Sequence, residues 1–265
     1  MNDYLVALFL GFIEGLTEYI PVSSTGHLIL LIEGLNFPSP PGRVFEVFIQ
    51  IGAILAVMVL YREKIFRTIC GIPNDKTAQR FALNIIIGTI PALIIGAMLH
   101  DFIKQVLYSP MIIAASLIIG AIIILLFDKK FDSPRVENID DISPKQALAI
   151  GFCQSIALIP GVSRSGATIM GSLALGLSRG AATEFSFFLA MPVMFCAVAY
   201  DLYKNWDAIA DSSDYMGLML TGLAGAFVTA LFVVKTVVGF VSRHGFAPFA
   251  YYRIALGLAA LVIFW

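Results

Sequence analysis

Acidic, hydroxyl and imidazole side chains gather around a break in an apolar segment near the start of the chain. Glu14 and Glu18 are four residues apart, so a helix would place both carboxylates on one face. A charged side chain at the middle of a membrane helix costs roughly 2.5–3.5 kcal/mol. Two carboxylates on one face therefore need a cation, a shared proton or a wet cavity beside them. They are candidate ligands for a metal ion.

Three consecutive hydroxyl side chains follow these acids, between Pro21 and His27. A helix that begins near Ser24 would direct its free N–H groups and the positive end of its dipole into the break, which favours an anion such as phosphate. Helix capping accounts for one hydroxyl but not for three. We interpret Ser24 as a nucleophile with His27 as its general base. The candidates for phosphate binding in this segment are Ser23, Thr25 and Gly26.

Two other mechanisms use the same residues. His27 could itself attack phosphorus, or a metal-activated water could attack with Glu18 as its base. All three mechanisms need cationic stabilisation of the departing phosphate, which a metal ion held by Glu14 and Glu18 would provide in part.

A second broken segment repeats the first. GFIEGLTEYIPVSSTGHLIL occupies positions 11–30, and GFCQSIALIPGVSRSGATIM occupies positions 151–170. Among the identical positions, Gly11 pairs with Gly151, Phe12 with Phe152, Val22 with Val162, Ser23 with Ser163 and Gly26 with Gly166. A duplicated apolar segment interrupted by proline and glycine points to a binding site near the middle of a membrane protein.

The second copy supplies an arginine where the first supplies acids. Arg164 is always charged, and its planar fork of donors suits phosphate oxygens. It could instead neutralise Glu14 or Glu18 as an internal ion pair, and the two roles are compatible. Other candidates for phosphate binding in this copy are Ser163, Ser165, Gly166 and Thr168.

Composition indicates the class of protein that must position these residues. The chain is 59% hydrophobic and 13% charged, with a mean hydropathy of +0.89, whereas soluble domains carry about 25% charged residues. The net charge of −1 gives no basic surface for nucleic acid. We therefore expect an all-α polytopic membrane protein.

Six apolar runs are long enough to span a bilayer, which takes about 20 residues; they lie near 44–61, 81–99, 111–127, 184–200, 216–234 and 249–265. The two broken segments are interpreted as re-entrant helical hairpins, because irregular backbone at that depth needs protein or a wet cavity around it. Each half then has a hairpin and three spans, so that the second half is inverted. We expect a single membrane domain over 1–265, with repeat one at about 1–127, a linker at about 128–145 and repeat two at about 146–265.

Basic residues test this topology independently. Twelve of them fall on one side, namely Arg62, Lys64, Arg67, Lys76, Arg80, Lys129, Lys130, Arg135, Lys145, Arg179, Lys235 and Arg243. The other side has Arg43, Lys104 and Lys204. Because cytoplasmic loops carry the excess of lysine and arginine, both termini and the mouth of the first hairpin are expected outside, and the mouth of the second hairpin inside.

We interpret the remaining polar residues of the apolar runs as structural or supporting residues. Glu46 and Glu184 begin the first span of each half, where an acid favours the helix dipole. Gln50 and Gln154 are candidates for supporting hydrogen bonds around the site. Arg253 is interpreted as an interfacial anchor at the end of a span.

The motifs EGLTEYIPVSSTGH and PGVSRSGAT closely resemble the two signatures of the bacterial integral-membrane undecaprenyl-diphosphate phosphatases, the family associated with bacitracin resistance. The stretch around Gln50 and the run EFSFFLAMPVM from Glu184 resemble the same family. The resemblance implies hydrolysis of undecaprenyl diphosphate to undecaprenyl phosphate and phosphate, which recycles the lipid carrier for peptidoglycan synthesis. It also implies stimulation by Mg²⁺ or Ca²⁺ and functional roles for Glu14, Glu18, Ser24, His27 and Arg164.

The expected setting is the bacterial cytoplasmic (inner) membrane, with an active site that opens to the outer, periplasmic side. The expected partners are the polyprenyl diphosphate and membrane lipids, with a homodimer as one option and no nucleic acid. The alternative function is a lipid-phosphate flippase, alone or combined with the phosphatase, because inverted repeats with broken helices are also a transporter architecture.

Overall fold

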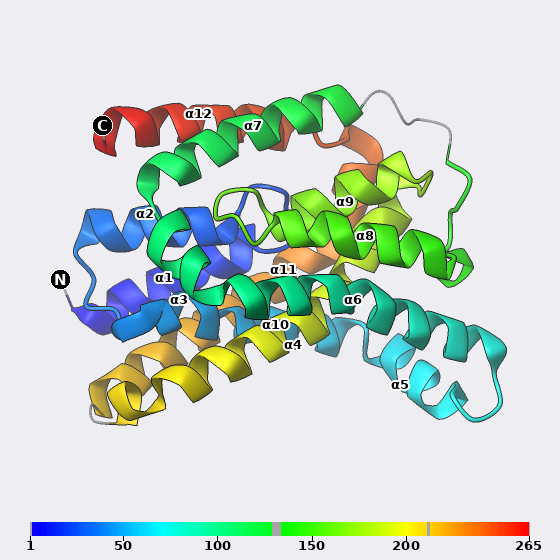
Figure 1. Ribbon diagram of the computed structural model, residues 1–265, viewed down its shortest axis with the longest axis horizontal. Coiled ribbons are helices and arrows are strands. Elements are labelled where there is room, and N and C mark those ends of the chain that lie inside the picture. Colours follow the sequence, from blue (N-terminus) through cyan, green and yellow to red (C-terminus); the bar gives the residue numbers. More distant parts are fainter. Residues whose placement is uncertain (1, 129–133, 211–212, 265) are drawn as a thin grey trace.

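The computed structural model describes residues 2–128, 134–210 and 213–264, and these residues form helices joined by loops (Figure 1). Lys129, Lys130 and Trp265 lie outside the described residues, as do positions 129–133 of the expected linker. The expectation of an all-helical chain is confirmed for the part that the structure describes.

Among the described residues, five helices are long and apolar enough to cross a membrane. They are α6 (Lys76–Phe102), α7 (Pro110–Asp128), α10 (Arg179–Ala210), α11 (Ser213–His244) and α12 (Ala247–Phe264). A sixth candidate is a bent pair, in which α3 (Val44–Phe48) and α4 (Gln50–Leu60) meet α5 (Arg62–Gly71) at 73°; it counts as a span only if the pair is taken as one. The described residues of all six expected spans therefore lie mainly in helices, although the bend into α5 was not expected.

The two repeated segments form two broken helix pairs. The first pair is α1 (Asp3–Thr17) with α2 (Ser24–Leu35), and the second is α8 (Pro144–Ile156) with α9 (Arg164–Ala174). The two breaks lie beside each other at the centre of the molecule, with the spans around them (Figure 1). Short helical turns at Pro41–Arg43, Ile103–Leu107 and Ile139–Asp141 complete the described structure.

Both second helices begin on the same cap. Ser23 and Ser163 have φ of 69° and 77°, which is uncommon for a residue other than glycine. Their hydroxyls accept hydrogen bonds from the backbone N–H groups of Gly26 (3.3 Å) and Gly166 (3.1 Å). Each cap satisfies one N–H group of a first turn, whose other N–H groups have no partner within the helix.

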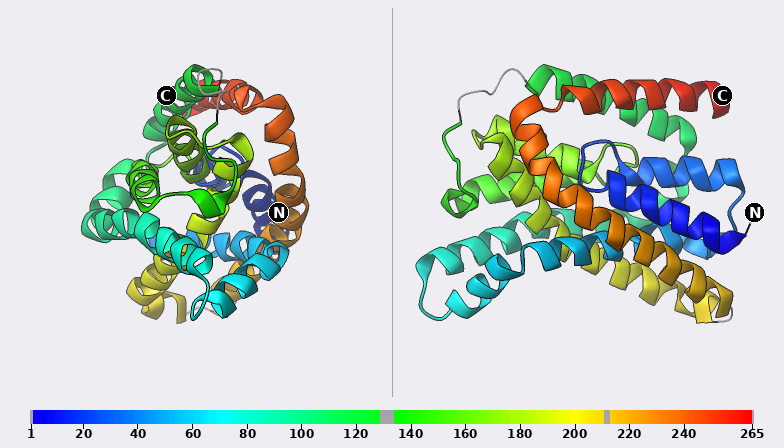
Figure 2. Two further views of the ribbon diagram at one scale, coloured as in Figure 1. Left: turned by 90° about the vertical axis from the view of Figure 1, so that its right-hand side faces the viewer. Right: turned by 180° about the vertical axis from the view of Figure 1, so that it is seen from behind.

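The first helix of each pair packs against a span from the other half, α1 against α11 and α8 against α6. Matched glycines allow this close approach, because Gly11 faces Gly222 and Gly151 faces Gly88. The third spans of the two halves, α7 and α12, lie side by side along one edge (Figures 1 and 2). The described interior is therefore built from contacts between the halves.

Replacing Gly151 with alanine should destabilise the protein, because the added Cβ would lie 2.5 Å from the Gly88 carbonyl oxygen. Overpacking of this kind costs about 1–3 kcal/mol, which should lower the melting temperature in detergent. Gly239→Ala is the matched control, since its Cβ would meet nothing within 4 Å. An unchanged melting temperature for Gly151→Ala would contradict the close packing of α8 on α6.

The basic loops gather at one end of the molecule. The α5 segment and the turn Ile139–Asp141 lie at that end, and both termini lie at the opposite end (Figure 1). Ion pairs Lys64–Asp140 (2.5 Å) and Arg80–Asp141 (3.5 Å) fasten the turn to the basic loop. This grouping agrees with the expected separation of basic residues.

Candidate active site

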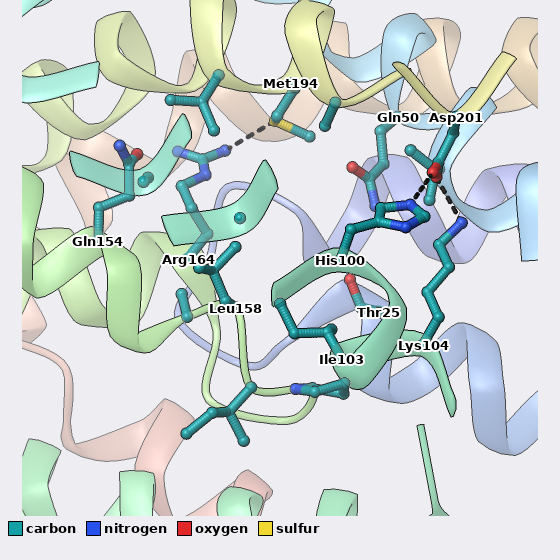
Figure 3. A pocket seen from close by; sticks show the side chains of 18 of the residues that line it. Thr25, Gln50, His100, Ile103, Lys104, Gln154, Leu158, Arg164, Met194 and Asp201 are labelled. Carbon is teal, nitrogen blue, oxygen red and sulfur yellow. Dashed lines mark hydrogen bonds and ion pairs between the residues drawn. The ribbon is translucent and has the colours of Figure 1, made fainter. Parts of the chain in front are cut away.

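A cavity of about 420 Å³ lies between the two breaks, α6 and α10 (Figure 3). From the first break it is lined by Glu18, Ser23, Ser24 and Thr25. From the second break it is lined by Gly161, Ser163 and Arg164. The acidic and basic halves that the sequence separates by more than a hundred residues therefore meet at one site.

Arg164 and Glu18 join the two breaks directly. The Nη2 atom of Arg164 donates to Oε1 of Glu18 at 2.7 Å, and both side chains are largely buried. The Nη1 atom of Arg164 donates to the carbonyl oxygen of Ser186 at 2.8 Å. The guanidinium also lies 5.6 Å from the centre of the Tyr19 ring.

One donor of Arg164 remains available. Its Nε–H is buried and has no hydrogen-bond partner among the described residues. A buried donor left unpaired costs free energy, so a ligand acceptor that reached it would be favoured. The guanidinium is thus held by Glu18 and Ser186 and still has a donor for a phosphate oxygen.

Ser24 lies at the first position of α2, and its hydroxyl donates to Oε2 of Glu18. The sequence interpretation paired Ser24 with His27 instead. Both nitrogens of His27 are engaged elsewhere, Nδ1 with the carbonyl oxygen of Ser23 (2.7 Å) and Nε2 with the Tyr252 hydroxyl (2.7 Å). The carboxylate in contact with Ser24 is therefore that of Glu18, and His27 is not among the residues that line the cavity.

Glu14 is fully buried one turn before Glu18, and neither of its carboxylate oxygens has a hydrogen-bond partner among the described residues. Unpaired carboxylate oxygens of this kind suit a hard divalent cation, which prefers oxygen ligands. The described residues contain no group of three acidic, histidine or cysteine side chains arranged for a metal. Glu14 and Glu18 fit such an ion only if hydroxyl, water or phosphate oxygens complete its coordination.

Several of the expected phosphate-binding hydroxyls make hydrogen bonds within the protein, and one of these bonds joins the two breaks. Ser165 donates to the carbonyl oxygen of Ile20 (2.9 Å), and Thr168 donates to the Ser186 hydroxyl (2.7 Å). Ser163 bonds to the Ser165 hydroxyl at 3.1 Å. Of the expected set, Ser23, Ser24, Thr25 and Ser163 line the cavity, whereas Gly26, Ser165, Gly166 and Thr168 do not line it.

Glu46 lies in the first turn of α3, as interpreted, and is buried beside Arg43 (3.7 Å). The interpretation of Glu184 was wrong, because α10 begins five residues earlier, at Arg179, and Glu184 lies beyond its first turn. Glu184 instead accepts a hydrogen bond from the Tyr61 hydroxyl (3.3 Å). Gln50 and Gln154 both line the cavity, where they can support a ligand.

The interpretation of Arg253 as an interfacial anchor was wrong. Its side chain is fully buried, and it donates hydrogen bonds to backbone carbonyls of both breaks. A charged residue in the second turn of an apolar run was the signal for this role, because ionisable residues within spans usually face the interior of a membrane protein.

A second charged cluster, which the sequence analysis missed, lies at the other end of the cavity (Figure 3). The Asp201 carboxylate is buried and accepts hydrogen bonds from His100 Nε2 (2.8 Å) and Lys104 Nζ (2.7 Å). Apolar side chains, among them Ile103 and Leu158, form the wall between this cluster and Arg164. A cavity with polar ends and an apolar wall suits an amphiphilic ligand.

The chain is similar to known proteins over almost its whole length. Residues 7–259 match the family described as "Bacitracin resistance protein BacA". The chain is 50% identical over 261 residues to "Undecaprenyl-diphosphatase 2" of Paramagnetospirillum magneticum, covering 98% of this chain and 99% of that relative. It is 50% identical over 264 residues to "Undecaprenyl-diphosphatase" of Caulobacter vibrioides, covering 99% and 98%. It is 51% identical over 261 residues to the protein of that name in Acinetobacter baumannii, covering 98% and 95%.

Proposed function

The chain belongs to the bacitracin resistance protein BacA family, and from this premise we propose that it hydrolyses undecaprenyl diphosphate to undecaprenyl phosphate and inorganic phosphate. The observation that carries the proposal is the contact of Glu18 with both Ser24 and Arg164 at one cavity. A nucleophile, a base and a phosphate-binding cation are the parts that phosphoryl transfer to a serine requires. The reaction returns the lipid carrier to cell-wall synthesis.

In the proposed reaction, the Ser24 hydroxyl attacks the terminal phosphorus and passes its proton to the Glu18 carboxylate. The bond from that phosphorus to the bridging oxygen breaks, and undecaprenyl phosphate leaves with the electron pair. Arg164 and the N–H groups at the start of α2 stabilise the negative charge on the transferring group. Water then cleaves the phosphoserine, which releases phosphate and restores Ser24.

Glu18 replaces His27 as the proposed base because of the hydrogen bond from Ser24. His27 is bound to the Tyr252 hydroxyl behind the break, so its proposed role is to hold the first turn of α2 against α12. The hydrogen bond from Arg164 to Oε1 of Glu18 orients the carboxylate so that its other oxygen, Oε2, faces the Ser24 hydroxyl.

We further propose that Glu14 and Glu18 hold a divalent cation together with phosphate oxygens of the substrate. Such an ion would neutralise phosphate charge at the reacting centre. The two unpaired oxygens of Glu14 support this assignment, since a buried carboxylate without partners is otherwise costly.

Chelation is therefore expected to remove phosphate release, and Mg²⁺ or Ca²⁺ is expected to restore it. Glu14→Gln keeps the size of the side chain and removes its charge, so it should raise the metal concentration needed for half-maximal activity by at least about tenfold. Titration of activity and direct metal binding by calorimetry would measure this shift. An activity that EDTA leaves unchanged would contradict the metal assignment without affecting the roles of Ser24 and Arg164.

The two halves are proposed to be inverted repeats, each with a re-entrant helix pair and three spans. The matched caps at Ser23 and Ser163 and the matched glycine contacts of α1 and α8 support this proposal. The excess of basic residues at one end supports a cytoplasmic location for that end. The cavity reaches Lys104 and Asp201, which lie toward the opposite end, so the site would open to the outer side of the bacterial inner membrane.

Phosphate release from undecaprenyl diphosphate by purified protein in detergent tests the proposed function. A phosphatase releases phosphate without a bilayer, whereas a lipid-phosphate flippase without hydrolytic activity releases none. Folded wild-type protein that releases no phosphate, with the metal supplied, would overturn the phosphatase and leave the flippase.

A further inference from the structure

Arg253 on α12 is fully buried and makes five hydrogen bonds, all of them to backbone carbonyls. A guanidinium has five N–H donors in a fixed planar fork. The number of carbonyl contacts equals the number of donors, at distances between 2.9 and 3.2 Å. This side chain is therefore saturated by the backbone around it.

These carbonyls belong to three separate segments. In the first break, Arg253 Nη1 donates to Pro21 at 3.0 Å. In the second break, Nη1 donates to Val162 at 3.0 Å and Nη2 donates to Gly161 at 2.9 Å. The other two bonds, from Nε and Nη2, end on Leu117 and Ser116 of α7. One guanidinium thus joins both breaks to α7.

In the sequence, the break carbonyls that Arg253 contacts come just before the residues proposed to act on phosphate. Pro21 lies two positions before the cap at Ser23, after which Ser24 begins α2. Gly161 and Val162 precede the cap at Ser163, after which Arg164 begins α9. Backbone that lies between helices has no helical hydrogen bonds of its own to fix it. Arg253 supplies those bonds to both breaks at once.

The positive charges of the two buried arginines at the site are compensated by different groups. Arg164 is paired with the Glu18 carboxylate, whereas no carboxylate is paired with Arg253 among the described residues. Burying a cation without a counter-ion is costly unless oriented dipoles compensate it. The carbonyl oxygens supply that compensation, and the positive charge remains between the starts of α2 and α9.

We propose that Arg253 is the positioning residue of the composite site, which holds the two breaks in the mutual placement that brings Ser24 and Arg164 to the same phosphate group. The inference rests on the proposed phosphatase function. Its expected signature is a loss of turnover at nearly constant substrate affinity, because the groups that bind the phosphate remain present and only their mutual alignment changes.

Arg253→Lys tests the proposal while keeping the charge. Lysine has three donors on one nitrogen and lacks the planar fork, so it cannot reproduce the five hydrogen bonds that Arg253 makes to the three segments. We expect kcat to fall about a hundredfold, the loss that accompanies a misplacement of about 1 Å, with KM within a few-fold of wild type. Arg253→Met removes the charge as well, and in addition to the loss of kcat it should raise KM.

Gly120→Ala displaces the guanidinium without removing it. A Cβ on Gly120 of α7 would collide with the Nη2 atom of Arg253 and lie 2.8 Å from its Cζ atom, so that the guanidinium would have to shift. Alanine in place of glycine otherwise favours the helix. Its expected effect is again a lower kcat with little change in KM, while Gly239→Ala, which meets open space, should behave as wild type.

Rates are compared per folded molecule, after size-exclusion chromatography and a melting curve in detergent. A purely structural role would lower yield or melting temperature and leave kcat and KM of the folded fraction unchanged, and that result would overturn the proposal. If Arg253→Lys does not fold, Gly120→Ala decides between the same two outcomes. An inactive but folded wild-type protein would instead refute the proposed function, which is a separate result.

Discussion

Replacement of Arg164 with lysine is expected to lower kcat for phosphate release by about 10³-fold or more. An arginine that stabilises the transferring phosphoryl group is worth about 10³–10⁵ in kcat. Lysine keeps the charge, but it cannot hold Glu18 and Ser186 and still present a third donor in the same plane. Charge alone therefore should not rescue the activity. Initial rates of phosphate release at saturating substrate would measure the loss.

Arg179→Lys is the matched control for that experiment. Arg179 is paired with Asp128 at 3.3 Å, at the start of α10 and outside the cavity. The same arginine-to-lysine change there should leave kcat within a few-fold of wild type. An Arg164→Lys variant with the turnover of Arg179→Lys would show that the guanidinium of Arg164 serves the fold rather than the reaction.

Ser24→Ala should cause the second large loss of kcat for phosphate release. Removing the serine nucleophile from a hydrolase that forms a covalent intermediate costs on the order of 10⁶-fold in kcat. Here the hydroxyl also contacts the Glu18 carboxylate, its proposed base, at the start of α2. Rapid quenching of wild type with substrate labelled at the terminal phosphate should trap label on Ser24, and the variant should trap none.

Ser155→Ala is a suitable control, because the Ser155 hydroxyl donates only within its own helix, to the carbonyl oxygen of Gly151 at 3.1 Å. Its phosphate release and its trapped label should equal those of wild type. Label that persists in Ser24→Ala and disappears in His27→Gln would identify His27 as the nucleophile. Turnover without label in wild type would instead favour direct attack by water.

The spans and the breaks could be predicted from the sequence because their causes are local. A run of apolar residues fixes the length of a span, and Pro21 and Pro160 with their neighbouring glycines interrupt the repeated segments. The caps at Ser23 and Ser163 follow from the same short stretches. The bend between α4 and α5 at Tyr61 has no such signal, since neither proline nor glycine stands there.

The sequence predicted which residues belong to the site, but it did not determine which of them contact one another. An ion pair between Arg164 and Glu18 was one of two roles foreseen, but the partner of Ser24 depends on which side of α2 faces the cavity. The choice of Glu18 over His27 required that orientation.

The roles of Arg253 and Asp201 depend on distant segments. Arg253 meets Pro21 across more than two hundred residues of sequence, and a pattern within one span carries no information about such a partner. Asp201 resembles any acid near the end of a helix until α10 packs against α6 and brings it to His100 and Lys104.

The central claim is that Glu18 from the first break and Arg164 from the second act in one active site. A double-mutant cycle tests it most directly, with kcat for phosphate release measured for wild type, Glu18→Gln, Arg164→Lys and the double variant. Residues that act as a unit are strongly non-additive. The account predicts that the double variant loses little more activity than the worse single variant. A loss equal to the product of the two single losses would mean that Glu18 and Arg164 act independently, and it would contradict the composite site.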